Sequence, residues 1–244
     1  MILQTPPSAK DLVITWEPLP DDFVLPDDPV ENIQQPILAA ALTDALGEAG
    51  LIKPEVLIAS NFGLVATVNG RTIVKAPDWL YVPQVAPVPE GTVRRSYTQT
   101  LEGDPVAIVM EFLSDEDSSE YSVRPIYPYG KLYFYERILR VPTYVIFDPY
   151  SLDLEVWQLQ DGRYILQAAD EQGRFWIPAL NLFLGVWYGS RLGSTLHWLR
   201  WWDAAGNLLF WSSEQVEQER QRAEAAEQEL ERLRSLVQQQ QNQH

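Results

Sequence analysis

The first clear pattern in the chain is a run of apolar residues at helical spacing between Asn32 and Ala49. Apolar side chains three or four positions apart fall on one face of a helix. Gly50 follows the run, and glycine is common directly after a helix end. The pattern therefore predicts a helix over residues 32–49, with apolar positions at Ile33, Ile37, Leu38, Ala41, Leu42, Ala45 and Leu46.

Shorter segments have the length and composition of β-strands. Residues 55–60, 63–68 and 71–83 are rich in β-branched and aromatic residues, and the pair Asn69-Gly70 favours a hairpin turn. The segment DPVAIVMEFLS is apolar on both faces until Glu111, which is typical of a central buried strand.

The second half of the domain continues this alternation of elements. Residues 131–139 predict a helix, VPTYVIFDP predicts another buried strand, and LDLEVWQL and RYILQA alternate as two antiparallel strands around Asp161-Gly162. Two aromatic-rich segments, 175–189 and 195–203, are expected to close the core. The order of elements indicates an α/β domain over residues 31–211. The proline-rich residues 1–30 are expected to form an extended arm lying on it.

From Ser212 onward the composition changes to Glu, Gln, Arg, Ala and Leu. Alternating spacings of three and four, interrupted by Glu219, connect Val216, Ala223, Ala226, Leu230, Leu233 and Val237. Residues 212–244 are thus expected to form a heptad helix with a disordered end. Two interpretations stay open: a coiled coil that joins two chains or binds a protein partner, and an exposed amphipathic helix that frays.

Composition narrows the chemistry. The absence of cysteine excludes disulfides and thiolate metal sites, and two histidines, His197 and His244, are too few for a typical zinc centre. Any bound metal should therefore be a hard, oxygen-seeking cation. No run reaches the roughly 18 uncharged apolar residues of a spanning helix, and the first residues lack the signal-peptide pattern, so we expect a cytoplasmic protein without membrane contact.

The net charge of −16 disfavours loose adhesion to nucleic acid, because phosphate neutralisation requires clustered Lys and Arg. A local basic strip would still allow binding, and five arginines are candidates for it: Arg94, Arg95, Arg124, Arg137 and Arg140. Exposed surface arginines without any such role are the alternative.

Three ionisable residues stand where strands or a helix can direct them to one point. Asp78 follows a proline, Glu111 ends an apolar run, and Lys131 opens the predicted helix. Two carboxylates, helped by the carbonyl of Phe112, suffice for Mg²⁺, which usually keeps several waters. Such a metal would polarise a scissile phosphate, and Lys131 would stabilise transition-state charge or orient the attacking water.

Each of these residues also has a simpler explanation. Asp78 can be a turn former, and Lys131 can be a surface lysine at a helix start, although the helix dipole disfavours a cation there. Glu111 is harder to explain without function, since a carboxylate on a buried strand is costly unless it is paired or bound to metal. Tyr135, one helical turn after Lys131, can hydrogen-bond in the site or serve core packing.

Taken together, PDWLYV, VMEFLS and GKLYFYERILRVPTYVIFDP resemble the Uma-type putative restriction endonuclease family of the PD-(D/E)xK nuclease superfamily. The resemblance runs from about Glu31 to Leu184. It implies an α/β fold with a restriction-endonuclease-like core, a mixed sheet flanked by helices. It also implies that Asp78 and Glu111 are metal ligands, Lys131 the catalytic lysine and Tyr135 its companion on the helix.

The chain departs from the superfamily pattern at the lysine. The usual position, two residues after the glutamate, holds Leu113. The resemblance implies that Lys131 replaces it from a nearby helix. Members also carry an acid between the glutamate and the lysine, for which Glu120 is the candidate. On the first helix, Glu31 is expected to orient a metal ligand without touching the ion or to bind a second metal, or else to be only an acid favoured by the helix dipole.

These inferences lead to two functional hypotheses. The first is a Mg²⁺-dependent DNA endonuclease, with Mn²⁺ as a substitute metal, acting as a homodimer because double-strand cutting normally needs two sites. The second is a catalytically idle, nuclease-like assembly module that uses its acidic surface and coiled-coil tail. The three intact catalytic-type residues favour the first hypothesis.

Overall fold

The computed structural model describes residues 12–20, 33–113 and 121–241. The first helix, α1, spans Gln34–Glu48 and confirms the helix predicted from the apolar spacing. Its buried residues include Leu38, Leu42 and Leu46, which recur every four positions.

Within the described residues, the central layer is a six-stranded sheet of order β10-β9-β8-β7-β5-β2. Strands β7 and β8 run parallel and the other neighbours run antiparallel, so the sheet is mixed. The six strands are β2 Leu57–Ala59, β5 Trp79–Val82, β7 Ile108–Phe112, β8 Thr143–Phe147, β9 Leu154–Gln160 and β10 Arg163–Leu166.

Two smaller sheets pack around this layer. One contains β1 Ile14–Thr15, β3 Gly63–Val68, β4 Arg71–Lys75 and β6 Ser96–Tyr97. The other contains β11 Phe175–Ile177, β12 Leu182–Arg191 and β13 Ser194–Trp202. The predicted hairpin turn at Asn69-Gly70 is confirmed, because both residues have positive φ and connect β3 to β4. The segment 71–83 forms two strands in different sheets, where the sequence suggested one run.

Both faces of the central sheet are covered by apolar residues. Because side chains alternate along a strand, Met110 and Phe112 of β7 pack with α1 in one cluster, whereas Val109 packs in a second cluster on the opposite face. The second cluster includes residues of β3 and of the helix that begins at Lys131. The architecture is therefore mixed α/β, with a helix on each face of the sheet.

The helix predicted over residues 131–139 is confirmed, but it has two geometries. It begins as α2, Lys131–Tyr133, and continues as the π-helical turn η3, Phe134–Leu139. The wider π turn buries three consecutive residues, Phe134, Tyr135 and Glu136. Such turns occur frequently at functional sites.

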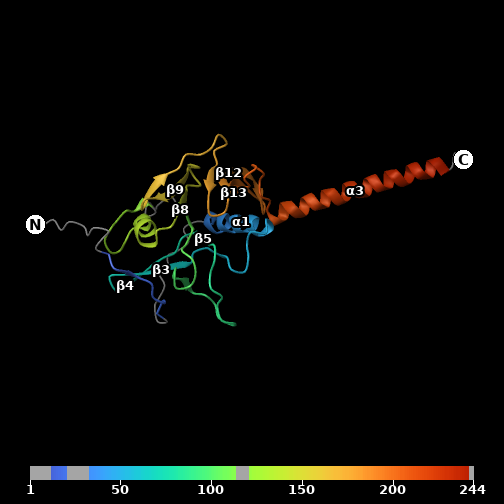
Figure 1. Ribbon diagram of the computed structural model, residues 1–244. Coiled ribbons are helices and arrows are strands. Elements are labelled where there is room, and N and C mark those ends of the chain that lie inside the picture. Colours follow the sequence, from blue (N-terminus) through green and yellow to red (C-terminus); the bar gives the residue numbers. More distant parts are fainter. Residues whose placement is uncertain (1–11, 21–32, 114–120, 242–244) are drawn as a thin grey trace, which may run out of the picture.

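The last helix, α3, spans Ser212–Gln241 and projects from the domain as a single helix (Figure 1). Residues 219–235 are all exposed. A coiled coil requires a second helix against it, so the coiled-coil interpretation stays a prediction.

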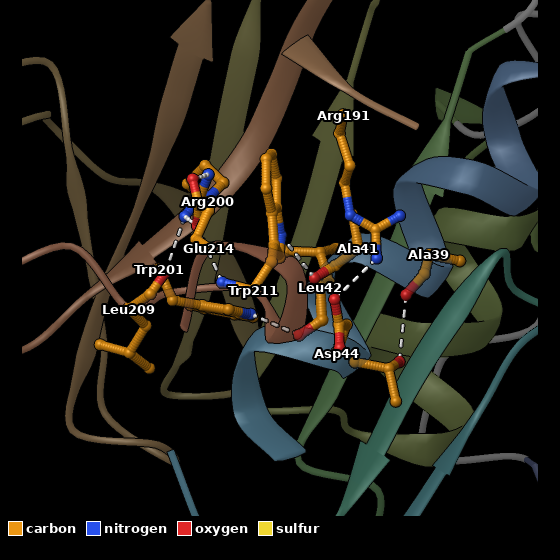
Figure 2. A network of polar contacts seen from close by, with 11 residues as sticks. Ala39, Ala41, Leu42, Asp44, Arg191, Arg200, Trp201, Leu209, Trp211 and Glu214 are labelled. Carbon is orange, nitrogen blue, oxygen red and sulfur yellow. Dashed lines mark hydrogen bonds and ion pairs between the residues drawn. The ribbon is translucent and has the colours of Figure 1, made fainter. Parts of the chain in front are cut away.

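The start of α3 is fixed by a network around Arg200 (Figure 2). Arg200 is fully buried and donates to both carboxylate oxygens of Glu214, at 3.1 and 2.6 Å. Glu214 also accepts from the backbone N–H of Trp211 at 2.8 Å, as in a capping box. The indole of Trp211 donates to the carbonyl of Ala41 in α1 at 3.0 Å. The network thus connects β13, α1 and α3.

The expected domain boundaries, at residues 30/31 and 211/212, stay predictions. Of the N-terminal arm it describes residues 12–20, where β1 pairs with β3 through Ile14 and Val68. Among the described helices, none combines the length and hydropathy needed to cross a membrane.

We expect Glu214→Ala to lower the free energy of unfolding by about 3 kcal/mol, because it leaves the buried Arg200 without its carboxylate. Urea denaturation followed by tryptophan fluorescence measures this change. The control is Glu217→Ala on the same helix, whose partners Arg220 and Gln221 are exposed; it should shift stability by less than about 0.5 kcal/mol. Equal effects of the two variants would contradict an anchoring role for Glu214.

Candidate active site

The sheet register brings the two predicted carboxylates to facing positions. Strand β5 pairs antiparallel with β7, with Trp79 opposite Met110 and Leu80 opposite Val109. Continued by one residue, this register sets Asp78 opposite Glu111. Both side chains belong to the sheet face covered by η3, because their neighbours Trp79 and Met110 pack on the α1 side.

Glu111 is fully buried near the end of β7. Its Oε2 accepts from the Lys131 ammonium at 3.2 Å, and its Oε1 accepts from the Tyr135 hydroxyl at 2.9 Å. A buried carboxylate is costly unless it is paired and hydrogen-bonded. The structure supplies both kinds of partner from one helix.

Lys131 is the first residue of α2, and its side chain is 22% exposed. Gly130 allows the helix start to lie close to the preceding segment, because a Cβ there would be 2.1 Å from the carbonyl oxygen of Ser122. The same Ser122 oxygen accepts from the backbone N–H of Tyr133 at 3.3 Å. The ammonium thus lies between the buried Glu111 and solvent.

Tyr135 is fully buried, and its ring centroid lies 5.2 Å from that of Tyr144. Burial raises the pKa of Tyr135 well above its ordinary value, and the nearby charge of Glu111 raises it further. Its hydroxyl therefore stays protonated at neutral pH and acts as a hydrogen-bond donor. Tyr135 thus packs in the core and bonds to Glu111, and its role in a functional site stays a prediction.

The backbone of Phe112 is held at both its N–H and its carbonyl. Its N–H donates to Oδ2 of Asp78 at 2.6 Å, and its carbonyl accepts from Nε2 of Gln35 at 2.8 Å. A carbonyl oxygen has two lone pairs, so the Gln35 bond leaves one for another partner. Asp78 thus holds the chain beside Glu111 while its half-buried carboxylate stays at the site.

Gln35 is the residue near the site that the sequence analysis missed. It lies three, four and seven positions before Leu38, Ala39 and Leu42, on the face of α1 that packs on the sheet. A polar residue on this apolar face was the available signal. Glu31, the acid expected from the first helix, and Glu120, the acid expected between the glutamate and the lysine, lie outside the described residues.

The helix that carries Lys131 and Tyr135 is fixed to the sheet by Glu136. This buried carboxylate accepts from the backbone N–H of Tyr164 in β10 at 2.8 Å and pairs with Arg137 at 2.8 Å.

Of the five arginines proposed as a phosphate strip, Arg137 is engaged within the chain through this pair with Glu136. So is Arg94, which pairs with Glu102. A role in binding phosphate stays a prediction for the strip.

The donor set fits a hard divalent cation. Asp78 and Glu111 offer carboxylate oxygens, and the Phe112 carbonyl belongs to the residue whose N–H donates to Asp78. The described residues contain no group of three or more His, Cys, Asp and Glu suited to a metal. Mg²⁺ needs only one or two carboxylates because it retains water.

Comparison with known proteins identifies the family. The model of the Uma2 family, described as putative restriction endonuclease, matches residues 16–192. This match covers more than half of the chain and includes all the residues of the site, so the chain belongs to the Uma2 family. No curated protein sequence matches the chain.

We expect Tyr135→Phe to lower the free energy of unfolding by about 2 kcal/mol at neutral pH, because it removes a hydrogen bond to a buried carboxylate. Above pH 10 the unfolded tyrosine loses a proton that the folded one keeps, so the wild type loses stability that the variant cannot lose. The difference in the free energy of unfolding between the wild type and Tyr135→Phe should therefore become smaller above pH 10. Urea denaturation from neutral to alkaline pH measures both effects.

The control for this variant is Tyr150→Phe, since Tyr150 is 53% exposed. It should leave stability within about 0.5 kcal/mol of the wild type. A Tyr135→Phe protein that matches this control would mean that Glu111 does not depend on the tyrosine hydroxyl.

Proposed function

We propose that this member of the Uma2 family is a Mg²⁺-dependent DNA endonuclease that hydrolyses phosphodiester bonds at the site formed by Asp78, Glu111 and Lys131. One observation carries the proposal. Asp78, directly before β5, accepts from the N–H of the residue after Glu111, and the Lys131 ammonium lies 3.2 Å from Glu111. The family match supports a nuclease independently of this geometry.

In this proposal Asp78, Glu111 and the carbonyl of Phe112 hold Mg²⁺, for which Mn²⁺ can substitute. When bound, the ion supplies Lewis-acid polarisation of the phosphate and a lowered pKa for a coordinated water. The donor set of two carboxylates and a carbonyl supports this assignment, because magnesium prefers hard oxygen ligands.

The side chains around the carboxylates have separate tasks. Lys131 brings a positive charge to the solvent-facing side of Glu111, where it can stabilise charge on the phosphate in the transition state. Tyr135 remains a neutral donor, so it orients Glu111 and does not act as a base. Gln35 positions the Phe112 carbonyl from the α1 side.

The restriction-endonuclease-like core belongs to the same proposal. A mixed sheet with a helix on each face and the active site at one end of its central strands supports it. Cutting both strands of DNA requires two such sites, and a homodimer is the commonest way to provide them.

A second candidate function is an assembly module that keeps the nuclease fold without catalysis. The exposed helix α3 and the net charge of −16 favour it. The two candidates differ in whether the carboxylates bind a divalent cation, and this difference decides the first experiment.

We expect Mn²⁺ to bind the wild type in calorimetric titration and binding to be lost in Asp78→Ala and in Glu111→Ala, because each variant removes one proposed carboxylate ligand. Circular dichroism should verify the fold of each variant. Glu171→Gln, at an exposed position remote in sequence from the site, is the control and should bind as the wild type does. A wild type that binds no Mn²⁺ would favour the assembly module.

We expect Lys131→Met to reduce cleavage of duplex DNA by about 100-fold or more, since a removed transition-state donor typically has this effect. Mn²⁺ binding should persist, because the lysine is not a ligand in this proposal. The control is Lys53→Met, which replaces an exposed lysine and should leave cleavage unchanged. Full activity of Lys131→Met would remove the lysine from the mechanism.

A further inference from the structure

Helix α3 carries an apolar seam on an exposed surface. Residues 219–235 are exposed throughout, with Leu230 and Leu233 at 49% and 52%. With Ala223 and Ala226 they follow a spacing of three, four and three positions, the a and d positions of a heptad. Glu219 interrupts this seam nearer the domain, so a contact with another helix would begin at Ala223.

The charges beside the seam are arranged to suit a second copy of the same helix. In a parallel, in-register pair, each g position faces the e position five residues later on the other helix. Arg222 then faces Glu227, and Glu229 faces Arg234. Two-fold symmetry repeats both contacts, so all four cross-helix pairs join opposite charges.

The contacts that Glu229 already makes are compatible with this arrangement. Glu229 pairs with Arg232 of its own helix at 3.3 Å, through side chains that are 54% and 72% exposed. Exposed ion pairs of this kind contribute little. The Glu229 carboxylate can therefore also accept from an arginine on a second helix.

We infer that α3 is a docking surface for a second copy of this chain, with which it forms a parallel, in-register, two-stranded coiled coil from Ala223 onward. The network of Arg200, Glu214 and Trp211 fixes the direction in which α3 leaves its domain (Figure 2). A parallel pair brings both domains to the same end of the coiled coil. This assembly does not depend on the proposed nuclease activity, and its test measures association alone.

The chain contains no cysteine, so one introduced thiol reports the arrangement directly. In a parallel, in-register pair, Ala223→Cys puts two thiols at opposing a positions, within the range that a disulfide spans. We expect mild oxidation to convert most of this variant to a covalent dimer on a non-reducing gel. Gln228→Cys, at the outward f position of the same helix, is the matched control and should stay monomeric on the gel.

Sedimentation of the full chain provides the second measurement. The wild type should show a dimer that dissociates on dilution, and Leu230→Asp with Leu233→Asp should abolish it while the domain stays folded by circular dichroism. Reversing Arg222 and Arg234 to Glu should weaken self-association by about tenfold, and mixing with the Glu227→Arg, Glu229→Arg protein should restore it as a heterodimer.

Three results would overturn the inference. A wild type that is monomeric at all concentrations has no self-association through α3. A dimer that survives the Leu230→Asp, Leu233→Asp change uses another surface. A dimer without a disulfide in Ala223→Cys has a different orientation or register of the two helices.

Discussion

The burial of one carboxylate constrains most of the domain. Glu111 lies on β7, and the strands on either side of it, β5 and β8, are also buried. The charge of Glu111 therefore has to be compensated inside the protein. Lys131 and Tyr135 provide this compensation from one helix, and Glu136 of that helix binds β10. The helix therefore has to pack at one place and in one rotation on the sheet. Glu111, a charged residue that is unfavourable in a buried strand, thus determines how the helix over residues 131–139 packs on the central sheet.

Contacts from two different parts of the chain meet at the backbone of one residue. Asp78 approaches Phe112 from the face of η3 and accepts from its N–H, while Gln35 approaches from α1 and donates to its carbonyl. Further along α1, Trp211 and Trp201 donate to the carbonyls of Ala41 and Leu42. Helix α1 is therefore fixed between the site and the anchor of α3, although its apolar face alone would allow it to slide on the sheet.

Local patterns predicted most of the elements, because each pattern reports an interaction close in sequence. The helix at residues 34–48 and the hairpins at Asn69 and Asp161 follow from periodicity and turn chemistry. The break inside 71–83 falls at Pro77, a strand breaker that the sequence displays. The assignment of the two halves to different sheets and the π turn at Phe134 depend on tertiary contacts, so neither follows from the local pattern. The unusual positions of Asp78, Glu111 and Lys131 in the sequence made them candidates for the site. Gln35 was missed because its partner is 77 residues away.

The Phe112 amide has a consequence for spectroscopy. Its proton points to the Asp78 carboxylate at 2.6 Å between the heavy atoms, and the strand around it is buried. The chemical shift of this one backbone resonance therefore responds to the charge on Asp78. Because this amide is buried and hydrogen-bonded, we expect its exchange with solvent deuterium to be slow and to report the opening of the sheet at the same point. A single amide thus acts as a built-in probe that separates electrostatic events at the site from unfolding of the strand that supports it.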